Sequence, residues 1–334
     1  MSSSARHLAA LALFLAAACL AGPDVIATQP FTTPRVGIVW IGPRPVVGYI
    51  HDHFVQGMRE LGWIAGQNVV IEPRFANDKV ERLPALFGEL VAARVDVIVA
   101  PSPTLARIAK EATTAIPIVI ANVPDPVALG LVASVARPGG NVTGVTNRMV
   151  DLAPKCAQVI REILPRTPRL AALINPTDPS AEAWTREVRD AAAKLRFELR
   201  FFELARVEAL DSVLAEVTKY RPGALQVGLT PGLIHSVRHE IGQFGAKQKL
   251  PVVMCADPHH YMVPGVLFAY GTANAVVLRR VAAFVDRTLK GARPGDLPVD
   301  QMEQVAFHVS LRTAKALGLT IPQPVLFRAD RVIE

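Results

Sequence analysis

Apolar segments of strand length alternate with amphipathic segments of helix length along this chain, in two successive arrays. The first array begins with an apolar strand at 36–41 and a helix at about 51–61, and the second begins with a strand at 170–174. The strand at 95–100 is apolar without a break from Val97, which is typical of a parallel strand buried on both faces. Two arrays of matching order predict an α/β fold with two similar parallel-sheet lobes, each with helices on both faces of its sheet.

The segments after the second array indicate how the lobes are joined. A strand at 266–270 and a helix at 272–290 follow that array, and an extended segment at 305–309 comes later. Because this structure exceeds what one lobe needs, we expect the chain to return to the first lobe and cross again, through about three hinge strands. The expected lobes comprise 34–144 plus about 272–296, and 145–271 plus about 297–334.

The N-terminal segment is typical of a secretory signal peptide. Arg6 and His7 precede an uncharged apolar run at 8–20, and small residues follow the run. The run is too short to span a bilayer, which needs ~20 apolar residues. We therefore expect a signal peptide at 1–27 and a mature protein in the periplasm. Cys19 loosely resembles a lipoprotein cleavage site without the usual leucine, so a lipid anchor there is the lesser alternative.

The composition fits a globular protein of two domains, with 334 residues of which 51% are hydrophobic and 19% charged. The net charge is +7, but no basic run is interleaved with aromatic residues, so nucleic acid is not an expected partner. Cys156 and Cys255 follow the signal segment and lack the spacing of a redox or zinc motif. We expect two buried free thiols, with pairing left open.

Motifs of common enzymes do not occur in the sequence. A glycine-rich dinucleotide motif after a strand, a phosphate-binding loop and a nucleophile elbow are all missing. His235 and His239 have a spacing that could bind a metal, but a serine occupies the position where metalloproteases need Glu. We interpret these two as an exposed polar stripe and His51 and His53 as surface histidines. No catalytic residue, metal site or cofactor is expected.

Polar and aromatic side chains follow the expected strands. In open α/β sheets a ligand lies beyond the carboxyl ends of the strands, so two facing lobes place it between them. The candidate ligand-binding residues are Trp40, Gly42, Ser102, Thr104, Asn122 and Asp125 in the first lobe, Asn175, Thr177, Asp178, Thr230 and Asp257 in the second, and Thr146, Asn147 and Tyr270 at the hinges.

Three of these candidates, Ser102, Thr104 and Thr177, carry hydroxyls just before or at the start of expected helices. Hydroxyls and free N–H groups at a helix N-terminus can hold a carboxylate with the help of the helix dipole. Simple helix capping is the alternative for all three.

The remaining chemistry suits the other end of a small ligand. Asp125 and Asp257 could accept an ammonium or hydroxyl group, although each precedes a proline and could serve only to set a turn. Trp40 and Tyr270 could sandwich an apolar or aromatic body, with a core position as the alternative for Trp40. The set favours an amino acid or another small carboxylate with an apolar or aromatic body.

Five stretches of the chain have the residue patterns of a known family: 54–66, 82–86, 125–145, 313–319 and 328–330. On these stretches the chain resembles the ABC substrate-binding (TrpX-like) family, whose members are type I periplasmic binding proteins of ABC transporters. The segments 42–48 and 301–308 depart from the usual pattern, and the first of them borders the expected ligand site.

The resemblance implies a receptor for the import of small solutes by an ABC transporter. We expect a monomeric, non-enzymatic protein that closes about its hinge on a small molecule and delivers it to the ABC transporter permease. Some relatives are associated with aromatic amino acids. The alternatives are an exported α/β hydrolase-like enzyme that uses the same cleft, and a ligand sensor for a membrane signalling protein. A LacI-type regulator would need a DNA-binding segment where this chain has its signal sequence.

Overall fold

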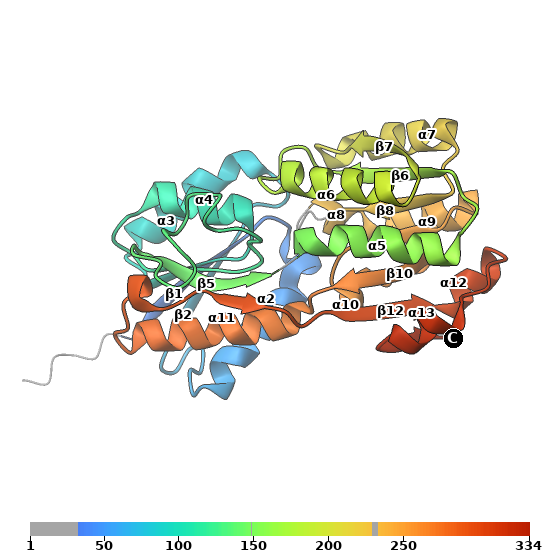
Figure 1. Ribbon diagram of the computed structural model, residues 1–334. Coiled ribbons are helices and arrows are strands. Elements are labelled where there is room, and N and C mark those ends of the chain that lie inside the picture. The colour runs from blue at the N-terminus through green and yellow to red at the C-terminus, as the bar shows by residue number, and fades with distance from the viewer. Residues whose placement is uncertain (1–32, 148, 229–232) are drawn as a thin grey trace, which may run out of the picture. The chain divides into compact units, whose positions relative to one another are not determined.

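The computed structural model describes residues 33–147, 149–228 and 233–334. The expected signal peptide, Cys19 and Thr230 lie outside these residues. Two sheets organise the described chain, as expected, and we call each sheet with its covering helices a lobe (Figure 1). The first sheet is parallel throughout and has the strand order β11-β5-β4-β3-β1-β2. Its strands are β1 (Arg35–Trp40), β2 (Val70–Phe75), β3 (Val97–Ala100), β4 (Ile118–Ile120), β5 (Val142–Asn147) and β11 (Asp300–Met302).

Helices cover both faces of the first sheet because alternate strand residues point to opposite sides. Val36, Ile38 and Trp40 of β1 pack with α2 and α11, whereas Val39 packs with α3 and α4. The helices α2 and α11 also lie against each other. The helical segments of this lobe are α2 (Arg44–Glu60), η1 (Val80–Arg82), α3 (Leu83–Ala92), α4 (Pro103–Ala112), α11 (Asn274–Leu289) and η3 (Pro294–Asp296).

The second sheet has the order β13-β12-β10-β9-β8-β6-β7 and is parallel except for the β10–β12 pair. Its strands are β6 (Arg169–Ile174), β7 (Glu198–Glu203), β8 (Ala224–Val227), β9 (Val252–Met254), β10 (Val266–Gly271), β12 (Ala306–Ser310) and β13 (Arg331–Ile333). The helical segments around it are α5 (Met149–Ile163), α6 (Ala181–Lys194), η2 (Val207–Ala209), α7 (Leu210–Tyr220), α8 (Leu233–Ser236), α9 (Arg238–Gln248), α10 (Pro258–Tyr261), α12 (Leu311–Ala316) and α13 (Gln323–Arg328).

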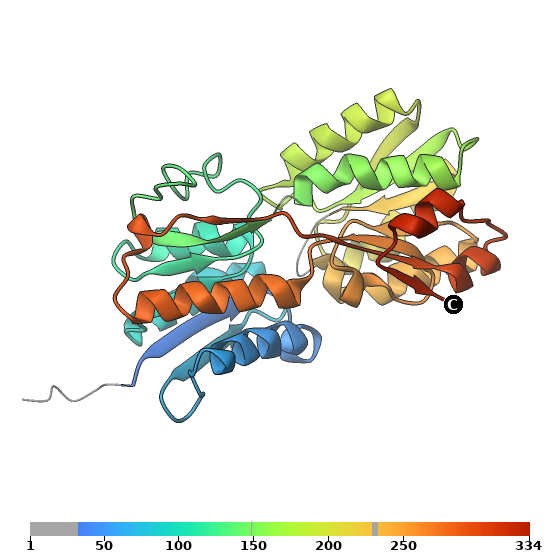
Figure 2. The same cartoon turned by 60° about the horizontal axis from the view of Figure 1, so that its bottom comes forward.

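Between its described elements the chain passes from one lobe to the other three times, from β5 to α5, from β10 to α11 and from β11 to β12. The last passage is the orange-red segment that joins the two lobes in Figure 2. Sheet membership extends the first lobe to Asn147, three residues beyond the bound expected from the sequence. It also adds Asp300–Met302 to the first lobe, because β11 pairs with β5. No helix in the described part of the chain is long and apolar enough to cross a membrane.

Both cysteines of the described chain, Cys156 on α5 and Cys255 after β9, are buried and free, as expected. Burial, together with the neighbouring Cys255 thiol, raises the pKa of Cys156 well above its usual value. Both thiols belong to the hydrophobic core between the second sheet and α5.

Candidate functional site

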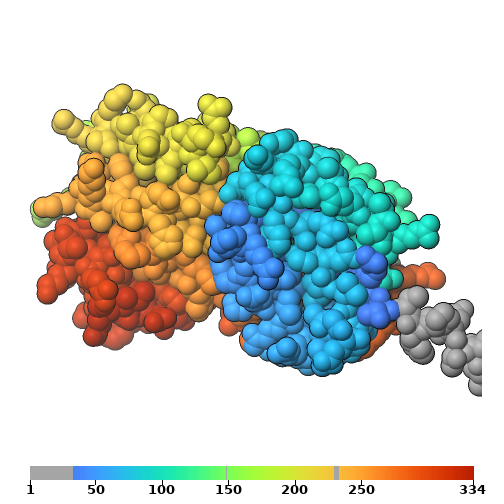
Figure 3. Space-filling view, turned by 180° about the vertical axis from the view of Figure 1, so that it is seen from behind, coloured from blue at the N-terminus to red at the C-terminus, as the bar shows by residue number. Residues whose placement is uncertain are grey.

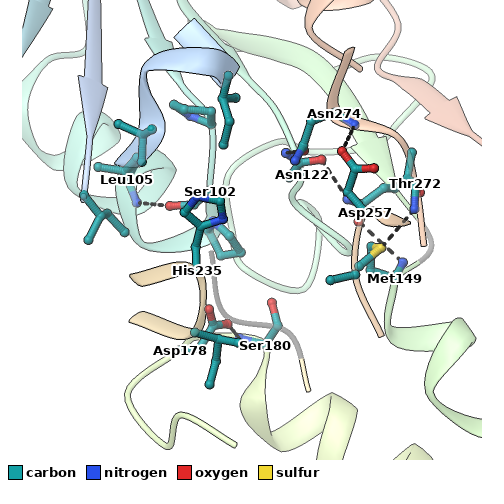
Figure 4. A pocket seen from close by; sticks show the side chains of 18 of the residues that line it. Ser102, Leu105, Asn122, Met149, Asp178, Ser180, His235, Asp257, Thr272 and Asn274 are labelled. Carbon is teal, nitrogen blue, oxygen red and sulfur yellow. Dashed lines mark hydrogen bonds between the residues drawn. The ribbon is translucent and has the colours of Figure 1, made fainter. Parts of the chain in front are cut away.

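A pocket lies between the lobes at the carboxyl ends of the sheet strands (Figure 4). It contains about 980 Å³ of empty space, including the part open to solvent at its mouth. Its walls come from both lobes and from two of the crossings between them. The described residues that line it are Trp40, Ile41, Gly42, Val47, Ile50, Pro101, Ser102, Pro103, Leu105, Asn122, Pro124, Asn147, Met149, Asp178, Ser180, Gly228, Ile234, His235, Ala256, Asp257, Tyr261, Thr272 and Asn274.

The N-terminus of α4 forms the polar part of the first-lobe wall. Ser102 is the N-cap residue, and its Oγ accepts a hydrogen bond of 3.2 Å from the Leu105 N–H. The Ser102 O–H therefore remains able to donate. Pro103 has no N–H, and the Thr104 N–H is one of those that the first helical turn leaves without an intrahelical partner.

A buried aromatic side chain ends β1 at the pocket. Trp40 is 4% exposed and meets the ring of His51 edge-on, with 6.2 Å between ring centroids. We expected His51 on the surface, and this was wrong: its ring is buried against Trp40, and burial lowers its pKa. Trp40 packs in the core of the first lobe and lines the pocket as well, so both interpretations of this residue describe part of its surroundings.

A chain of side-chain amides runs along the hinge side of the pocket. Asn147 Nδ2 donates to Asn122 Oδ1 at 2.9 Å, and Asn122 Nδ2 donates to Asn274 Oδ1 at 3.3 Å. The Asn274 backbone N–H in turn donates to Asp257 Oδ2 at 2.8 Å. Asn122 adopts a left-handed conformation with φ of 54°, which asparagine tolerates better than most residues. These contacts link the ends of β4 and β5 to the start of α11 and to the second lobe.

Asp257 has protein partners at both carboxylate oxygens. Besides its bond to Asn274, it caps α10 by accepting from the His259 N–H at 3.0 Å, and the His259 ring Nδ1 lies 3.0 Å from the same oxygen. These contacts match the turn-setting alternative that the following proline indicated.

Asp178 has fewer donors than Asp257. Its Oδ1 accepts from the Ser180 N–H at 2.8 Å at the start of α6. Burial raises the pKa of Asp178 to about 6, against the opposing effect of the hydrogen bonds from Ser180. This side chain therefore brings a partly compensated negative charge to the second-lobe wall. Figure 4 shows Asp178, His235 and Ser102 apart from the cluster of Asn122, Asn274 and Asp257.

His235 on α8 connects the two lobes across the pocket mouth. Its Nε2 lies 2.9 Å from the Val46 carbonyl oxygen on α2, and the neighbouring Ser236 Oγ donates to Asp78 Oδ1 at 3.0 Å. Figure 3 shows the surface of the first lobe around α2 in blue against the orange surface of the second lobe. The expected exposed stripe with His239 was wrong for His235, because the helix is interrupted at Val237 and the ring is 1% exposed.

Three polar atoms of lining residues are buried without a hydrogen-bond partner among the described residues. They are Trp40 Nε1 in the first lobe, His235 Nδ1 in the second and Thr272 Oγ1 at the crossing that leads to α11. These three atoms have almost no accessible surface in the ligand-free structure, so they are buried polar groups beside the pocket and not contact points on its open wall.

The structure brings part of the predicted site together. Tyr270 does not line the pocket; its ring packs on Phe307 with 5.3 Å between centroids. Asn175 and Thr177 bond to each other, with 2.8 Å between Oδ1 and Oγ1, and like Thr104 they do not line the pocket. Asp125 and Thr146 line a neighbouring hollow that also reaches Asn147. The predicted residues that line the pocket itself are Trp40, Gly42, Ser102, Asn122, Asn147, Asp178 and Asp257.

Sequence reasoning missed the residues that do not directly follow a strand. Val47 and Ile50 lie on α2, Tyr261 lies on α10, and Ile234 and His235 lie on α8. The sequence could have indicated Ile234 and His235, because α8 is the first helix after β8 and the segment after a parallel strand borders the ligand site in this class of sheet.

Comparisons with known proteins agree with this architecture. A tyrosine-binding protein from Clostridioides difficile (strain R20291) is 23% identical over 288 residues, which cover 85% of this chain and 81% of that protein. A conserved domain protein from Vibrio cholerae has a similar structure, with a TM-score of 0.83, 24% identity, and coverage of 90% of this chain and 100% of that one. An ABC domain in complex with L-Trp from Streptococcus pneumoniae has a TM-score of 0.82 and 22% identity, with coverage of 90% of this chain and 100% of that one.

The family comparison covers almost the whole described chain. The model of ABC transporter substrate binding proteins matches residues 35–333, which include both lobes, the three crossings and every described residue of the pocket. The chain therefore belongs to the family of ABC transporter substrate-binding proteins.

Proposed function

We propose that this substrate-binding protein captures an aromatic amino acid between its lobes and delivers it to an ABC permease. The observation that carries the proposal is a pocket with a helix N-terminus on one wall, a carboxylate on the other and apolar side chains between them. Such a pocket suits a ligand with a carboxylate, an ammonium group and a large apolar body.

The ligand carboxylate binds at the start of α4. The positive end of the helix dipole favours an anion there, and the Ser102 O–H can donate to it.

The ligand ammonium pairs with Asp178. Burial raises the pKa of this carboxyl, so a cation beside it recovers the interactions that Asp178 loses on leaving water. Asp257 already has partners at both oxygens, which leaves Asp178 as the better acceptor for the ammonium group.

The aromatic body of the ligand occupies the apolar part of the pocket, against Trp40, Val47, Ile50 and Tyr261. Aromatic side chains provide a large apolar area and prefer edge-to-face or offset contact with one another. The tyrosine-binding relative and the L-Trp complex of a protein with the same fold support this ligand class.

Transport proceeds by hinge closure. A ligand that touches both lobes shifts the population toward the closed form, in which His235 meets the Val46 carbonyl, and the permease recognises that form. We place the protein in the periplasm as a monomer that leaves its ligand chemically unchanged.

Calorimetric titration of the purified protein tests the ligand class. We expect L-tyrosine, L-tryptophan or L-phenylalanine to bind more tightly than L-leucine, which has the same charged groups without a ring. A bound ligand at about 100 times its dissociation constant adds ~2.7 kcal/mol of stability, which a thermal-shift assay detects. Equal or absent binding of all four refutes the ligand class.

Small-angle scattering and product analysis test the mechanism. The radius of gyration falls on ligand addition if the lobes close, and identical profiles at saturation contradict closure. Recovery of the intact amino acid after prolonged incubation is expected, and any turnover that survives purification would favour an enzyme.

A further inference from the structure

Two pairs of side chains join the lobes beside the pocket. Ser236 Oγ of α8 donates to Asp78 Oδ1, in the turn after β2, at 3.0 Å. The ring of Tyr49 on α2 lies on the ring of His260 on α10, with 3.5 Å between ring centroids and a tilt of 35°. Asp78 and Tyr49 belong to the first lobe, and Ser236 and His260 belong to the second. None of the four is among the described residues that line the pocket, and we call them the outer interlobe contact.

The local backbone holds Asp78 at this position. Asn77 and Asp78 are consecutive left-handed residues with φ of 56° and 61°, and the Asp78 N–H donates to the Ile41 carbonyl oxygen at 2.8 Å. A Cβ added to Gly42 would lie 3.6 Å from Asp78 Oδ1, so the carboxylate lies directly behind a residue of the pocket wall. Asparagine and aspartate tolerate the left-handed region better than most residues, and unusual backbone of this kind is concentrated at functional sites.

Closing the lobes removes the Asp78 carboxylate from water. Asp78 is half-buried, and burial raises the pKa of its carboxyl. The hydrogen bond from Ser236 opposes this rise, and the charge of Glu208 in the second lobe adds to it. A carboxylate that leaves water without a donor costs free energy. The Ser236 hydroxyl therefore compensates a charge that the closed form would otherwise bury with fewer donors.

Groups of the second lobe enclose the Tyr49 ring. His260 lies against it, and the His235 ring lies 5.4 Å away. Burial raises the pKa of Tyr49, and the second-lobe residues Tyr261 and Asp257 add to this rise. Aromatic rings in contact stabilise an interface through the area they bury and through the geometry of their π-systems. Because separation of the lobes would expose the Tyr49 ring, its contact with His260 favours the closed form.

We propose that the outer interlobe contact sets how tightly the protein holds every ligand of its pocket, by stabilising the closed form, and leaves the choice among ligands to the pocket itself. This inference rests on the hinge closure of the proposed function. The apparent dissociation constant of a ligand that binds the closed form equals its intrinsic value divided by the fraction of protein in that form. A residue that touches no ligand changes this fraction by the same factor for all of them. Loss of the contact should therefore weaken different ligands equally.

Two substitutions weaken the contact, and each has a matched control. Ser236→Ala removes the donor to Asp78, whereas Ser212→Ala removes a hydroxyl that donates to a carbonyl oxygen of its own lobe. Tyr49→Leu removes the ring and keeps an apolar side chain on α2, whereas Tyr49→Phe keeps a ring in the same place. Both controls should bind each amino acid within about twofold of the wild-type affinity.

Calorimetric titration with L-tyrosine, L-tryptophan and L-leucine measures affinity, and small-angle scattering without amino acid measures the shape of the unliganded protein. Where the open form dominates without ligand, Ser236→Ala and Tyr49→Leu should each weaken every amino acid that the wild type binds by about fivefold or more. The affinity ratios between amino acids should stay within about twofold of the wild-type ratios. Where the closed form dominates, the same variants should instead raise the radius of gyration of the unliganded protein.

Two results of these measurements overturn the proposal. One is a variant that changes the affinity ratios between amino acids, because the substituted residue then acts on the ligand and not on closure. The other is an affinity and a radius of gyration that both equal those of the wild type.

A cross-link tests the contact without any ligand. Asp78→Cys combined with Ser236→Cys places two thiols where the present side-chain atoms lie 3.0 Å apart, within reach of a disulfide when the lobes meet. Both native cysteines of the described chain are buried. In a glutathione redox buffer the new disulfide should form without an amino acid, as peptide mass spectrometry would show. Asp96→Cys with Ser236→Cys is the matched control and should form none, because Asp96 precedes β3 at the opposite end of the first sheet.

The cross-link also separates this proposal from the proposed ligand class. Failure of all three amino acids to bind refutes the ligand class alone. In that case Tyr49→Leu, added to the cysteine pair at 78 and 236, should slow cross-linking about fivefold or enlarge the unliganded protein. Absence of the cross-link, or absence of both of these changes, overturns the role of the outer interlobe contact.

Discussion

Replacing Asp178 by asparagine should make the unliganded protein more stable and its amino-acid binding weaker. The substitution keeps the size of the side chain and an oxygen for the Ser180 N–H, and it removes the negative charge. Its two effects have opposite signs because the charge is costly in the empty pocket and useful in the occupied one.

The pKa of Asp178 gives the magnitude. Burial raises it from 3.8 to about 6, and at 1.36 kcal/mol per pKa unit this makes ionisation cost up to about 3 kcal/mol at pH 7. The neutral amide is a weaker hydrogen-bond acceptor for Ser180, and this weaker bond offsets roughly 1 kcal/mol of the stability gained by removing the charge. The free energy of unfolding of Asp178→Asn should therefore exceed that of the wild type by about 1–2 kcal/mol at pH 7.

The pH dependence carries the same information. A carboxyl whose pKa is raised by folding holds its proton more tightly in the folded state, so stability is lost as pH rises from 3.8 to about 6. Urea denaturation at pH 4 and pH 7 isolates this loss as a difference between the two proteins: the free energy of unfolding of the wild type relative to that of Asp178→Asn should be lower at pH 7 than at pH 4. The buried histidines, whose lowered pKa values make stability rise over the same range, are present in both proteins and cancel.

The same substitution should weaken ligand binding, although it stabilises the unliganded protein. In Asp178→Asn the affinity for L-tyrosine should fall about 10- to 100-fold, as expected for loss of a hydrogen bond to a charged group. The affinity for 3-(4-hydroxyphenyl)propionate, which lacks the ammonium group, should be unchanged or higher. Calorimetric titration of both compounds decides the matter. A variant that binds both compounds as the wild type does would refute the pairing of Asp178 with the ligand ammonium.

Three further predictions follow from the same contacts. Ser102→Ala should weaken the binding of an amino acid several-fold more than the binding of its amide, because the carboxylate anion interacts more strongly with the α4 N-terminus than a neutral amide does. Equal losses of affinity in calorimetry would contradict this. Burial lowers the pKa of both His235 and His260 to about 4, so ligand affinity should fall about tenfold per histidine between pH 7.5 and 5.5. The measurement uses Asp178→Asn, in which residue 178 does not titrate, and an affinity that does not change with pH would contradict closure over neutral histidine rings. Gly265→Ala should lower the free energy of unfolding by about 2 kcal/mol or more, because the φ of Gly265 is 92° and a Cβ there would lie 1.9 Å from the Gly242 carbonyl oxygen. Ligand affinity of the folded protein should be unchanged, and a denaturation midpoint equal to that of the wild type would contradict the expected strain.

Hydrophobic pattern was sufficient to predict the two sheets. Strands buried on both faces carry unbroken apolar runs, as Val97–Ala100 does. Helix α11 carries similar short runs, and its greater length and its charged residues distinguish it from a strand. The start of α2 was harder to predict. The prolines and glycine at 42–48 indicate a loop, yet the helix begins at Arg44, because a proline in the first turn needs no intrahelical partner for its missing N–H.

The site was predicted where it depends on strand ends and missed where it depends on contacts between the lobes. His235 and Val46 are 189 residues apart in the sequence, and no local pattern indicates that they meet. The regular spacing of His235 and His239 was misleading because it assumed an uninterrupted helix. Tyr270 was expected at the hinge because it lies near the end of β10, but strand position alone does not determine which face of the sheet a side chain occupies.

The third crossing has a consequence for how the chain acquires its structure during synthesis. The first lobe needs α11 to cover α2 and β11 to complete its sheet, and these segments follow most of the second lobe in the sequence. A nascent chain that ends at Asn147 therefore has an uncovered apolar helix face and an unpaired edge on β5. The second sheet in turn takes β12 and β13 from the chain after β11, so neither sheet is complete until nearly the whole chain has been synthesised. We expect fragments that stop before Met302 to need a chaperone or to aggregate.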